Sequence, residues 1–224
     1  MKTITVLNLK GGVGRSTVAT NIAGTLARGS TGASKRSTAV LIDADLPQGT
    51  ARSWWALRAQ AGKAEGLDLS EADTAQALVQ EVTQAQERGV DWCVIDTPPR
   101  LASLARASLV LSDLVLIPVA ASAGEIWACS DVVSLIQEAK EVKKIDARLV
   151  WNRHRKNTKI AQEISDEAEK ILGLAVMKSS LGLRVSYVEA MGMGLTVEEM
   201  KSDSVARREL LSLVEEVKEI LKEK

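Results

Sequence analysis

The sequence predicts an α/β protein with a doubly wound, mostly parallel sheet flanked by helices, folded as a single domain over residues 1–224. Short apolar runs alternate along the chain with longer segments of helical periodicity. Within these runs, apolar residues occupy consecutive positions rather than every second one, which is typical of strands buried on both faces of a parallel sheet. A chain of 224 residues is long enough for one α/β core and short for two.

Each element is expected from its own pattern. Strands are predicted at Thr3–Leu9, Thr38–Ile42, Asp91–Ile95, Leu114–Val119 and Arg148–Trp151, with a weaker one near Ala175–Ser179. Helices are predicted at Ser16–Arg28, Thr50–Gln60, Glu71–Arg88, Leu101–Leu111, Gly124–Glu141, Lys159–Leu172 and Asp203–Lys222. The polar stretch Gly29–Ser37 suggests a flexible hairpin. Because ligands of such sheets bind at the carboxyl ends of the strands, we expect the functional residues there.

The composition excludes several classes of protein. Lys plus Arg and Asp plus Glu both number 29, so a nucleic-acid partner would have to meet a local basic surface. The two cysteines, Cys93 and Cys129, have neither metal-ligand spacing nor the pattern of a disulfide framework. The N-terminus enters a strand-like run at once, and no apolar stretch reaches membrane-spanning length, so we expect a cytoplasmic protein.

The strongest motif lies between the first expected strand and the first expected helix, and it reads Leu9-Lys10-Gly11-Gly12-Val13-Gly14-Arg15-Ser16-Thr17. Glycines let successive backbone N–H groups turn toward one anion, and the helix N-terminus adds its dipole. The Ser16 hydroxyl is placed to bind Mg²⁺. Residues Lys10 to Thr17 therefore predict the phosphate-binding loop of a P-loop NTPase.

This loop departs from the general pattern at two positions, because Leu9 replaces the first glycine and Arg15 replaces the lysine. The remaining Lys10-Gly11-Gly12-x-Gly14 resembles the deviant Walker A motif of the ParA/MinD family. The resemblance implies ATP or ADP with Mg²⁺ as ligands and an ATP-dependent homodimer. It also implies that Lys10 reaches across the dimer to the phosphates bound by the other subunit.

Arg15 departs from that family as well. An arginine keeps the positive charge and can bind phosphate at two points, but its planar fork is larger than an ammonium group. We therefore expect nucleotide binding with slow hydrolysis. A nucleotide-binding scaffold with little or no hydrolysis is the alternative.

Carboxylates end two further strands. Asp43-Ala-Asp45-Leu46-Pro47-Gln48 resembles the family's Asp-x-Asp-Pro-Gln with one residue inserted. By that resemblance Asp45 orients the attacking water and Asp43 lies in the outer coordination sphere of the metal. Asp96 ends the next apolar run and is expected to hold Mg²⁺ through water, together with Ser16. Lys10, Arg15 and Asp45 thus form the expected catalytic set.

The resemblance continues downstream. Ser122 and Glu125 follow a strand that leads to the dimer face in the family. Asn152 matches a residue that meets the adenine, although it could equally be a polar residue that begins a loop. Basic residues in the last third of the chain are candidates for DNA contact, with ordinary surface charge as the alternative. Arg184 is the best of them, and the weaker candidates are Lys178, Lys201, Arg207 and Arg208.

The ParA/MinD family contains several functional classes. A membrane-bound protein of the MinD kind needs a basic amphipathic C-terminal helix, whereas residues Arg207–Lys224 hold five basic and five acidic side chains. An iron–sulfur reductase needs two cysteines at the dimer face, whereas Cys93 is expected in the core. We therefore expect a short ParA-type ATPase that binds nonspecific duplex DNA on the nucleoid. Its cargo would be a plasmid, a chromosome region or a protein body, and a ParB-like or cargo-adaptor protein would stimulate it; a MinD-like positioning ATPase is the alternative.

Overall fold

The structure is a computed structural model that describes residues 1–29, 37–46, 48–99, 102–120, 122–154, 168–200 and 202–223. Seven strands form one sheet in the order β3-β2-β4-β1-β5-β6-β7, and the pairings between them are parallel. The strands are β1 Lys2–Val6, β2 Ala39–Asp43, β3 Leu67–Glu71, β4 Trp92–Asp96, β5 Leu114–Val119, β6 Ala147–Trp151 and β7 Ala175–Val176. The predicted parallel sheet is confirmed.

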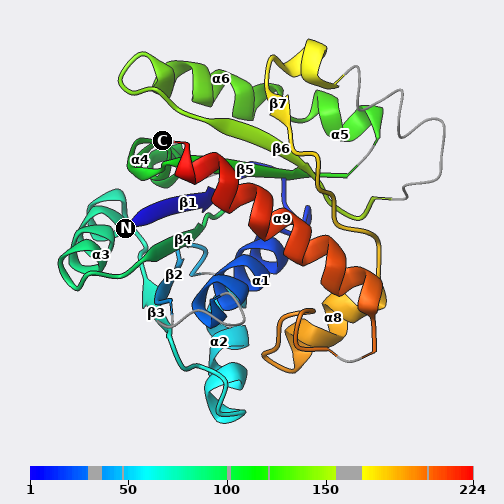
Figure 1. Ribbon diagram of the computed structural model, residues 1–224. Helices are drawn as coiled ribbons and strands as arrows, with labels where there is room; N and C mark the ends of the chain where they lie inside the picture. Colours follow the sequence, from blue (N-terminus) through cyan, green and yellow to red (C-terminus); the bar gives the residue numbers. More distant parts are fainter. Residues whose placement is uncertain are drawn as a thin grey trace.

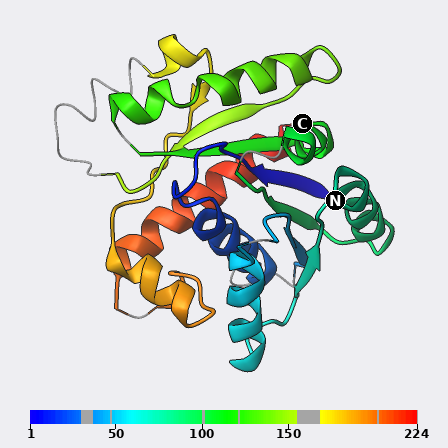
Figure 2. The same ribbon diagram turned by 180° about the vertical axis from the view of Figure 1, so that it is seen from behind.

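Helices cover both faces of this sheet (Figures 1 and 2). Helices α1 Arg15–Arg28, α2 Thr50–Gln60, α8 Val185–Gly192 and α9 Ser204–Lys222 lie on one face. Helices α3 Ala75–Glu87, α4 Ala102–Leu111, α5 Ala123–Trp127 and α6 Ser130–Lys140 lie on the other. This arrangement is the doubly wound fold that the alternation of strands and helices predicts.

The strands are apolar throughout because both of their faces are buried. In β2, Leu41 packs into the cluster formed with α1 and α9, whereas Val40 and Ile42 pack into the cluster formed with α3 and α4. The apolar face of α9 lies in the first of these clusters, with Leu210, Leu213, Val214 and Val217 buried. The last helix is therefore part of the core. No helix in the described ranges combines the length and apolar character needed to cross a membrane.

Strand β3 was not expected from the sequence. It occupies the edge of the sheet, and Leu67 and Leu69 alternate along it with Asp68 and Ser70, so only one of its faces is apolar. The predicted helix Glu71–Arg88 was wrong at its start, because Glu71 ends this strand. Helix α3 begins at Ala75, where the hydroxyl of Thr74 accepts a hydrogen bond from the Ala77 amide.

The predicted helix Gly124–Glu141 is two helices, α5 and α6, separated at Ala128–Cys129. Neither a glycine nor a proline marks this break, so no local signal could have placed it. Residues 168–172 of the predicted helix Lys159–Leu172 are helical, and its earlier part lies outside the described residues. Most of the stretch Gly29–Ser37 lies outside them as well.

Candidate nucleotide-binding site

The order of the strands brings the predicted site residues together at the carboxyl ends of β1, β2 and β4. Strand β4 lies between β2 and β1, and the register places Asp96 beside both Asp43 of β2 and Val6 of β1. The glycine-rich loop continues from β1, so it passes next to both carboxylates before α1 begins at Arg15. Candidates from three segments far apart in the sequence therefore meet at one site.

Glycines are required where the loop turns into α1. Gly14 has φ 91° and Gly12 has φ 76°, a region that other residues rarely adopt. A side chain on Gly14 would also collide with the amide of Asn152, which follows β6. That amide donates a 2.8 Å hydrogen bond from Nδ2 to the Val13 carbonyl. The conformation of the loop is thus fixed by its own glycines and by a residue from the other half of the chain.

Two adjoining hollows open at the carboxyl ends of these strands and share four lining residues, Gly14, Thr17, Thr50 and Arg153. One has a volume of about 330 Å³ and is lined mainly by loop glycines and polar side chains. The other has a volume of about 300 Å³ and is lined largely by apolar side chains of α8 and the segment before it. The hollow of about 330 Å³ is lined by Gly11, Gly12, Gly14, Arg15, Ser16, Thr17, Asp45, Gln48, Thr50, Pro99 and Arg153. A hollow beside loop amides and polar side chains, next to an apolar one, suits the phosphates and the base of a nucleotide, so we call the first the phosphate-side hollow.

Arg15 is 6% exposed, and the protein itself holds its guanidinium. Nε donates to the carbonyl of Thr97 at 2.8 Å, and Nη1 donates to the carbonyls of Asn8 and Lys10 at 2.9 and 2.6 Å. Nη2 lies 3.6 Å from the Asp45 carboxylate. Arg15 therefore ties the ends of β1 and β4 to the loop, and its donors already have partners.

Burial and neighbouring charges have opposite effects on the pKa values of Arg15 and Asp45. Burial lowers the pKa of Arg15, while the carboxylates of Asp96 and Asp45 act in the opposite direction. Burial raises the pKa of Asp45, and Arg15 opposes that shift. Asp43 accepts hydrogen bonds from the backbone amides of Asp45 and Arg52 at 3.0 and 2.9 Å, so its carboxylate shapes the segment after β2. Asp45 lines the phosphate-side hollow, and its role toward water stays a prediction.

Asp96 fits a Mg²⁺ site. It is fully buried, and neither carboxylate oxygen makes a hydrogen bond of normal geometry within the described part of the chain. Burial raises the pKa of Asp96 to about 7, although the nearby Ser16 hydroxyl opposes this shift. Among the residues that the structure describes, no group of three or more Asp, Glu, His or Cys side chains is arranged to hold a metal ion. A cation here would therefore need the oxygens of Asp96 and Ser16 together with nucleotide phosphates and water.

Lys10 pairs with a glutamate outside the glycine-rich loop. Its Nζ lies 2.6 Å from Oε1 of Glu125 in the first turn of α5, and its side chain is 43% exposed. Lys10 is absent from the lining of the phosphate-side hollow. The two cations of the loop thus differ, because Arg15 is buried and lines this hollow, whereas Lys10 is exposed and does not line it.

Asn152 and Arg153 lie where β6 ends. Asn152 lines the apolar hollow, as expected for a base contact, but its Nδ2 holds the loop and its Oδ1 accepts from the Arg153 amide. Arg153 lines both hollows and has φ 54°, the only positive φ of a non-glycine residue in the described ranges. Sequence reasoning missed Arg153, because a basic residue after a strand resembles a solvated loop. Its place directly after Asn152 was the only signal.

The candidate DNA contacts differ in their surroundings. Arg184 forms a two-point ion pair with Glu209, at 3.0 Å from Nε and 2.9 Å from Nη2, so its fork is engaged within the protein. Lys178, Arg207 and Arg208 are exposed. Lys201 lies outside the described residues.

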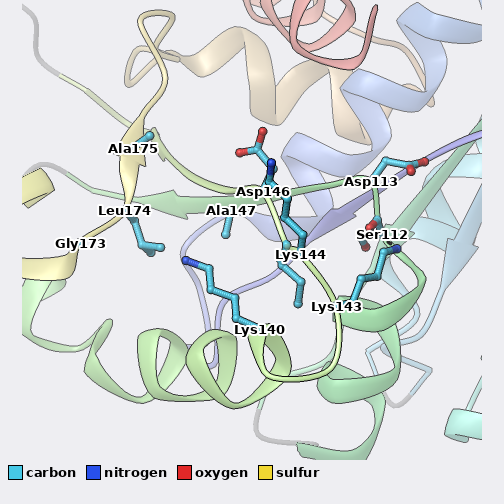
Figure 3. Close-up of a pocket in the computed structure, with 11 residues that line it drawn as sticks. Ser112, Asp113, Lys140, Lys143, Lys144, Asp146, Ala147, Gly173, Leu174 and Ala175 are labelled. Carbon is cyan, nitrogen blue, oxygen red and sulfur yellow. Dashed lines mark hydrogen bonds between the residues drawn. The ribbon is translucent and has the colours of Figure 1, made fainter. Parts of the chain in front are cut away.

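A further hollow of about 430 Å³ lies at the opposite end of the strands, beside the starts of β5, β6 and β7 (Figure 3). Its positive charges come from Lys140, Lys143 and Lys144. Lys143 donates to the carbonyls of Val110 and Ser112 at the C-terminal end of α4, both at 2.9 Å. Lys143 thus offsets the negative end of the α4 dipole.

Known proteins show the same organisation. Residues 2–166 match the sequence profile of the family described as ATPase MipZ. The chain belongs to the MipZ family of ATPases. Among relatives of this MipZ-family chain, Maintenance of carboxysome distribution protein A of Halothiobacillus neapolitanus is 30% identical, over 87% of this chain and 86% of its own length. Chromosome-partitioning ATPase Soj of Thermus thermophilus is 28% identical, over 97% of this chain and 95% of its own length.

A solved structure of a Cyanothece McdA variant in complex with ATP superposes with a TM-score of 0.71 at 18% identity, covering 99% of this chain and 96% of that one. At that identity the likeness shows the fold. The resemblance to the ParA/MinD family is confirmed, and the chain is an ATPase, while the roles of the individual site residues stay predictions.

Proposed function

We propose that this protein is an ATP-switched homodimer that binds duplex DNA without sequence specificity and positions a large cargo. The observation that carries the proposal is the place of Lys10, which does not line its own phosphate-side hollow and stays 43% exposed. A loop cation that does not face its own phosphates, but is presented at the surface, suits a role toward nucleotide bound by a second copy. Hydrolysis would then require the dimer, which couples the nucleotide state to assembly.

Within this mechanism each residue has a limited task. The backbone amides of the glycine-rich loop would bind the phosphates. Ser16 and Asp96 would hold Mg²⁺, which when bound would supply positive charge beside the phosphate oxygens. Asp45 lines the hollow where a water would attack, and we assign it to orienting that water. Lys10 of the second copy completes the positive charge around the transferred group.

The cargo that the relatives favour is a protein body. The relative from Halothiobacillus is named for maintaining carboxysome distribution and matches most of this chain. The relative from Thermus is named for chromosome partitioning, which makes a chromosome region the second candidate. A small adaptor protein on the cargo would stimulate the ATPase in either case.

Dimerisation provides the first test. Size-exclusion chromatography with light scattering should find a monomer without nucleotide or with ADP, and a dimer with ATP and Mg²⁺. Lys10→Ala should abolish the dimer and leave ADP affinity within about twofold, because Lys10 does not line its own hollow. Lys144→Ala, near the amino ends of the strands, is the matched control. An ATP-specific dimer that persists in Lys10→Ala would contradict the proposal.

DNA binding is tested on the same preparations. Binding to random duplex should require ATP and weaken steeply with salt, because it would rest on phosphate contacts. Replacing both Arg207 and Arg208 by alanine should weaken it equally for all sequences, since these arginines are exposed on α9. Arg184→Ala should act mainly through the lost ion pair with Glu209. Tight binding without nucleotide, or preference for one sequence, would argue against this part.

A further inference from the structure

Glu125 occupies a position with two competing roles. Ser122 and Glu125 have the Ser-x-x-Glu spacing of a capping box, in which the glutamate reaches back to the N–H of the capping residue. Half of the box is formed, because Ser122 Oγ accepts from the Glu125 amide at 3.3 Å. The Ser122 amide donates instead to the carbonyl of Ala120 at 2.8 Å. The Glu125 carboxylate is committed to Lys10 at 2.6 Å.

The backbone on the Lys10 side of this contact is held firmly. The Lys10 amide donates to Oδ1 of Asn8 at 2.9 Å, and the Lys10 carbonyl accepts from Arg15 at 2.6 Å. Asn8 in turn donates to the carbonyl of Pro118 in β5 at 2.9 Å. With its backbone fixed, Lys10 can change partner only by rotating its side chain.

We propose that Glu125 is a latch that holds Lys10 within its own protomer until the ATP dimer forms. The proposal rests on the function proposed above, in which Lys10 serves nucleotide bound by a second copy. Lys10 cannot pair with Glu125 at 2.6 Å and also reach another protomer, so each dimer forms only after two latches open. On opening, Glu125 can complete the capping box by accepting from the Ser122 amide, which would exchange the Ala120 carbonyl for the carboxylate. The contact therefore has two arrangements, and dimerisation selects the open one.

The size of the effect follows from exposure. The side chains of Lys10 and Glu125 are 43% and 23% exposed, so the pair belongs with surface ion pairs rather than buried ones. A surface pair shifts an equilibrium by a factor of roughly 1.5–5. Because two pairs break per dimer, removing the latch should lower the dimer dissociation constant by the square of that factor, roughly 2–25-fold.

Sedimentation equilibrium with ATP and Mg²⁺ on Glu125→Gln measures this constant directly. Glu138→Gln is the matched control, because Glu138 makes a 3.0 Å surface pair with Arg106 on α4, away from the loop. We expect tighter dimerisation in Glu125→Gln and an unchanged constant in Glu138→Gln. An unchanged or raised dissociation constant in Glu125→Gln overturns the latch, the raised value showing that Glu125 supports the dimer.

Amine labelling of the nucleotide-free monomer gives a second readout that is independent of the dimer. Sulfo-NHS acetate, followed by mass spectrometry, should modify Lys10 roughly 1.5–5 times faster in Glu125→Gln, with the other lysines unchanged. Equal labelling of Lys10 in both proteins overturns the latch. Failure of the proposed function is distinguishable, because the wild-type protein would then show no ATP-specific dimer or Lys10→Ala would retain it.

Discussion

Replacing Arg15 by lysine would exchange a cation that the protein holds at four points for a compact ammonium. Three of these points are the carbonyls of Asn8, Lys10 and Thr97, and the fourth is the Asp45 carboxylate. A guanidinium committed in this way is poorly placed to meet charge that develops on a transferred phosphoryl group. An ammonium on a flexible stem can turn toward the phosphates with fewer bonds to break.

The expected changes in stability and in rate have opposite signs. Lysine lacks Nε and the second fork nitrogen, so it cannot reproduce all of these bonds, and each buried hydrogen bond lost costs roughly 0.5–1.5 kcal/mol. Arg15→Lys should therefore lower the free energy of unfolding of the nucleotide-free protein by about 1–3 kcal/mol. A well-placed charge contact is worth on the order of 10²–10³ in rate. Recovering part of it should raise turnover by at least about tenfold, or about 1.4 kcal/mol.

Steady-state ATPase rates at saturating ATP and Mg²⁺, and urea unfolding without nucleotide, test both changes on the same preparations. Nucleotide affinity should change little, because the loop amides supply most of the phosphate contacts. Arg106→Lys, at an exposed pair on α4, is the matched control and should alter neither quantity appreciably. Equal ATPase rates for wild type and Arg15→Lys would refute the reasoning and show that Arg15 is a competent replacement.

Two further predictions concern buried charges. Burial raises the pKa of Asp96 to about 7, so the stability contributed by its protonated form is complete below its unfolded pKa of about 4 and is lost as pH rises through about 7. Thermal melting should therefore show that the nucleotide-free protein loses stability between pH 5 and 8, while the stabilisation by ADP and Mg²⁺ grows over the same range. Asp96→Asn should flatten both trends. The same two trends in Asp96→Asn as in the wild type would contradict the assignment. Arg58 is buried, pairs with Glu199 at 2.7 Å and lies 5.2 Å from the Trp54 ring, so Arg58→Ala should cost roughly 3–5 kcal/mol in urea unfolding. Arg106→Ala should lower the free energy of unfolding by less than about 1 kcal/mol. A similar loss in both variants would show that the buried pair contributes no more to stability than the exposed one.

The sequence alone determined the fold class and the glycine-rich loop between β1 and α1. Both depend on local sequence patterns, because continuous apolar runs reflect burial on both faces of the sheet and glycines permit the turn into α1. Gly14 illustrates this, since its φ of 91° is a property of one residue and its neighbours. The strand-end positions of Asp43 and Asp96 could likewise be read from the sequence. Strand β3 was missed because an edge strand lacks the signal of burial on two faces.

The tertiary structure decided which partners the charged side chains have. Lys10 and Glu125 lie 115 positions apart in sequence, and Arg15 and Thr97 lie 82 apart. The sequence offers Arg184 as the best candidate for DNA contact, whereas in the fold its guanidinium forms a two-point ion pair with Glu209. Periodicity and turn chemistry act over a few residues, so they fix the elements; which side chains meet depends on the order of strands in the sheet, which only the packing of the whole chain sets.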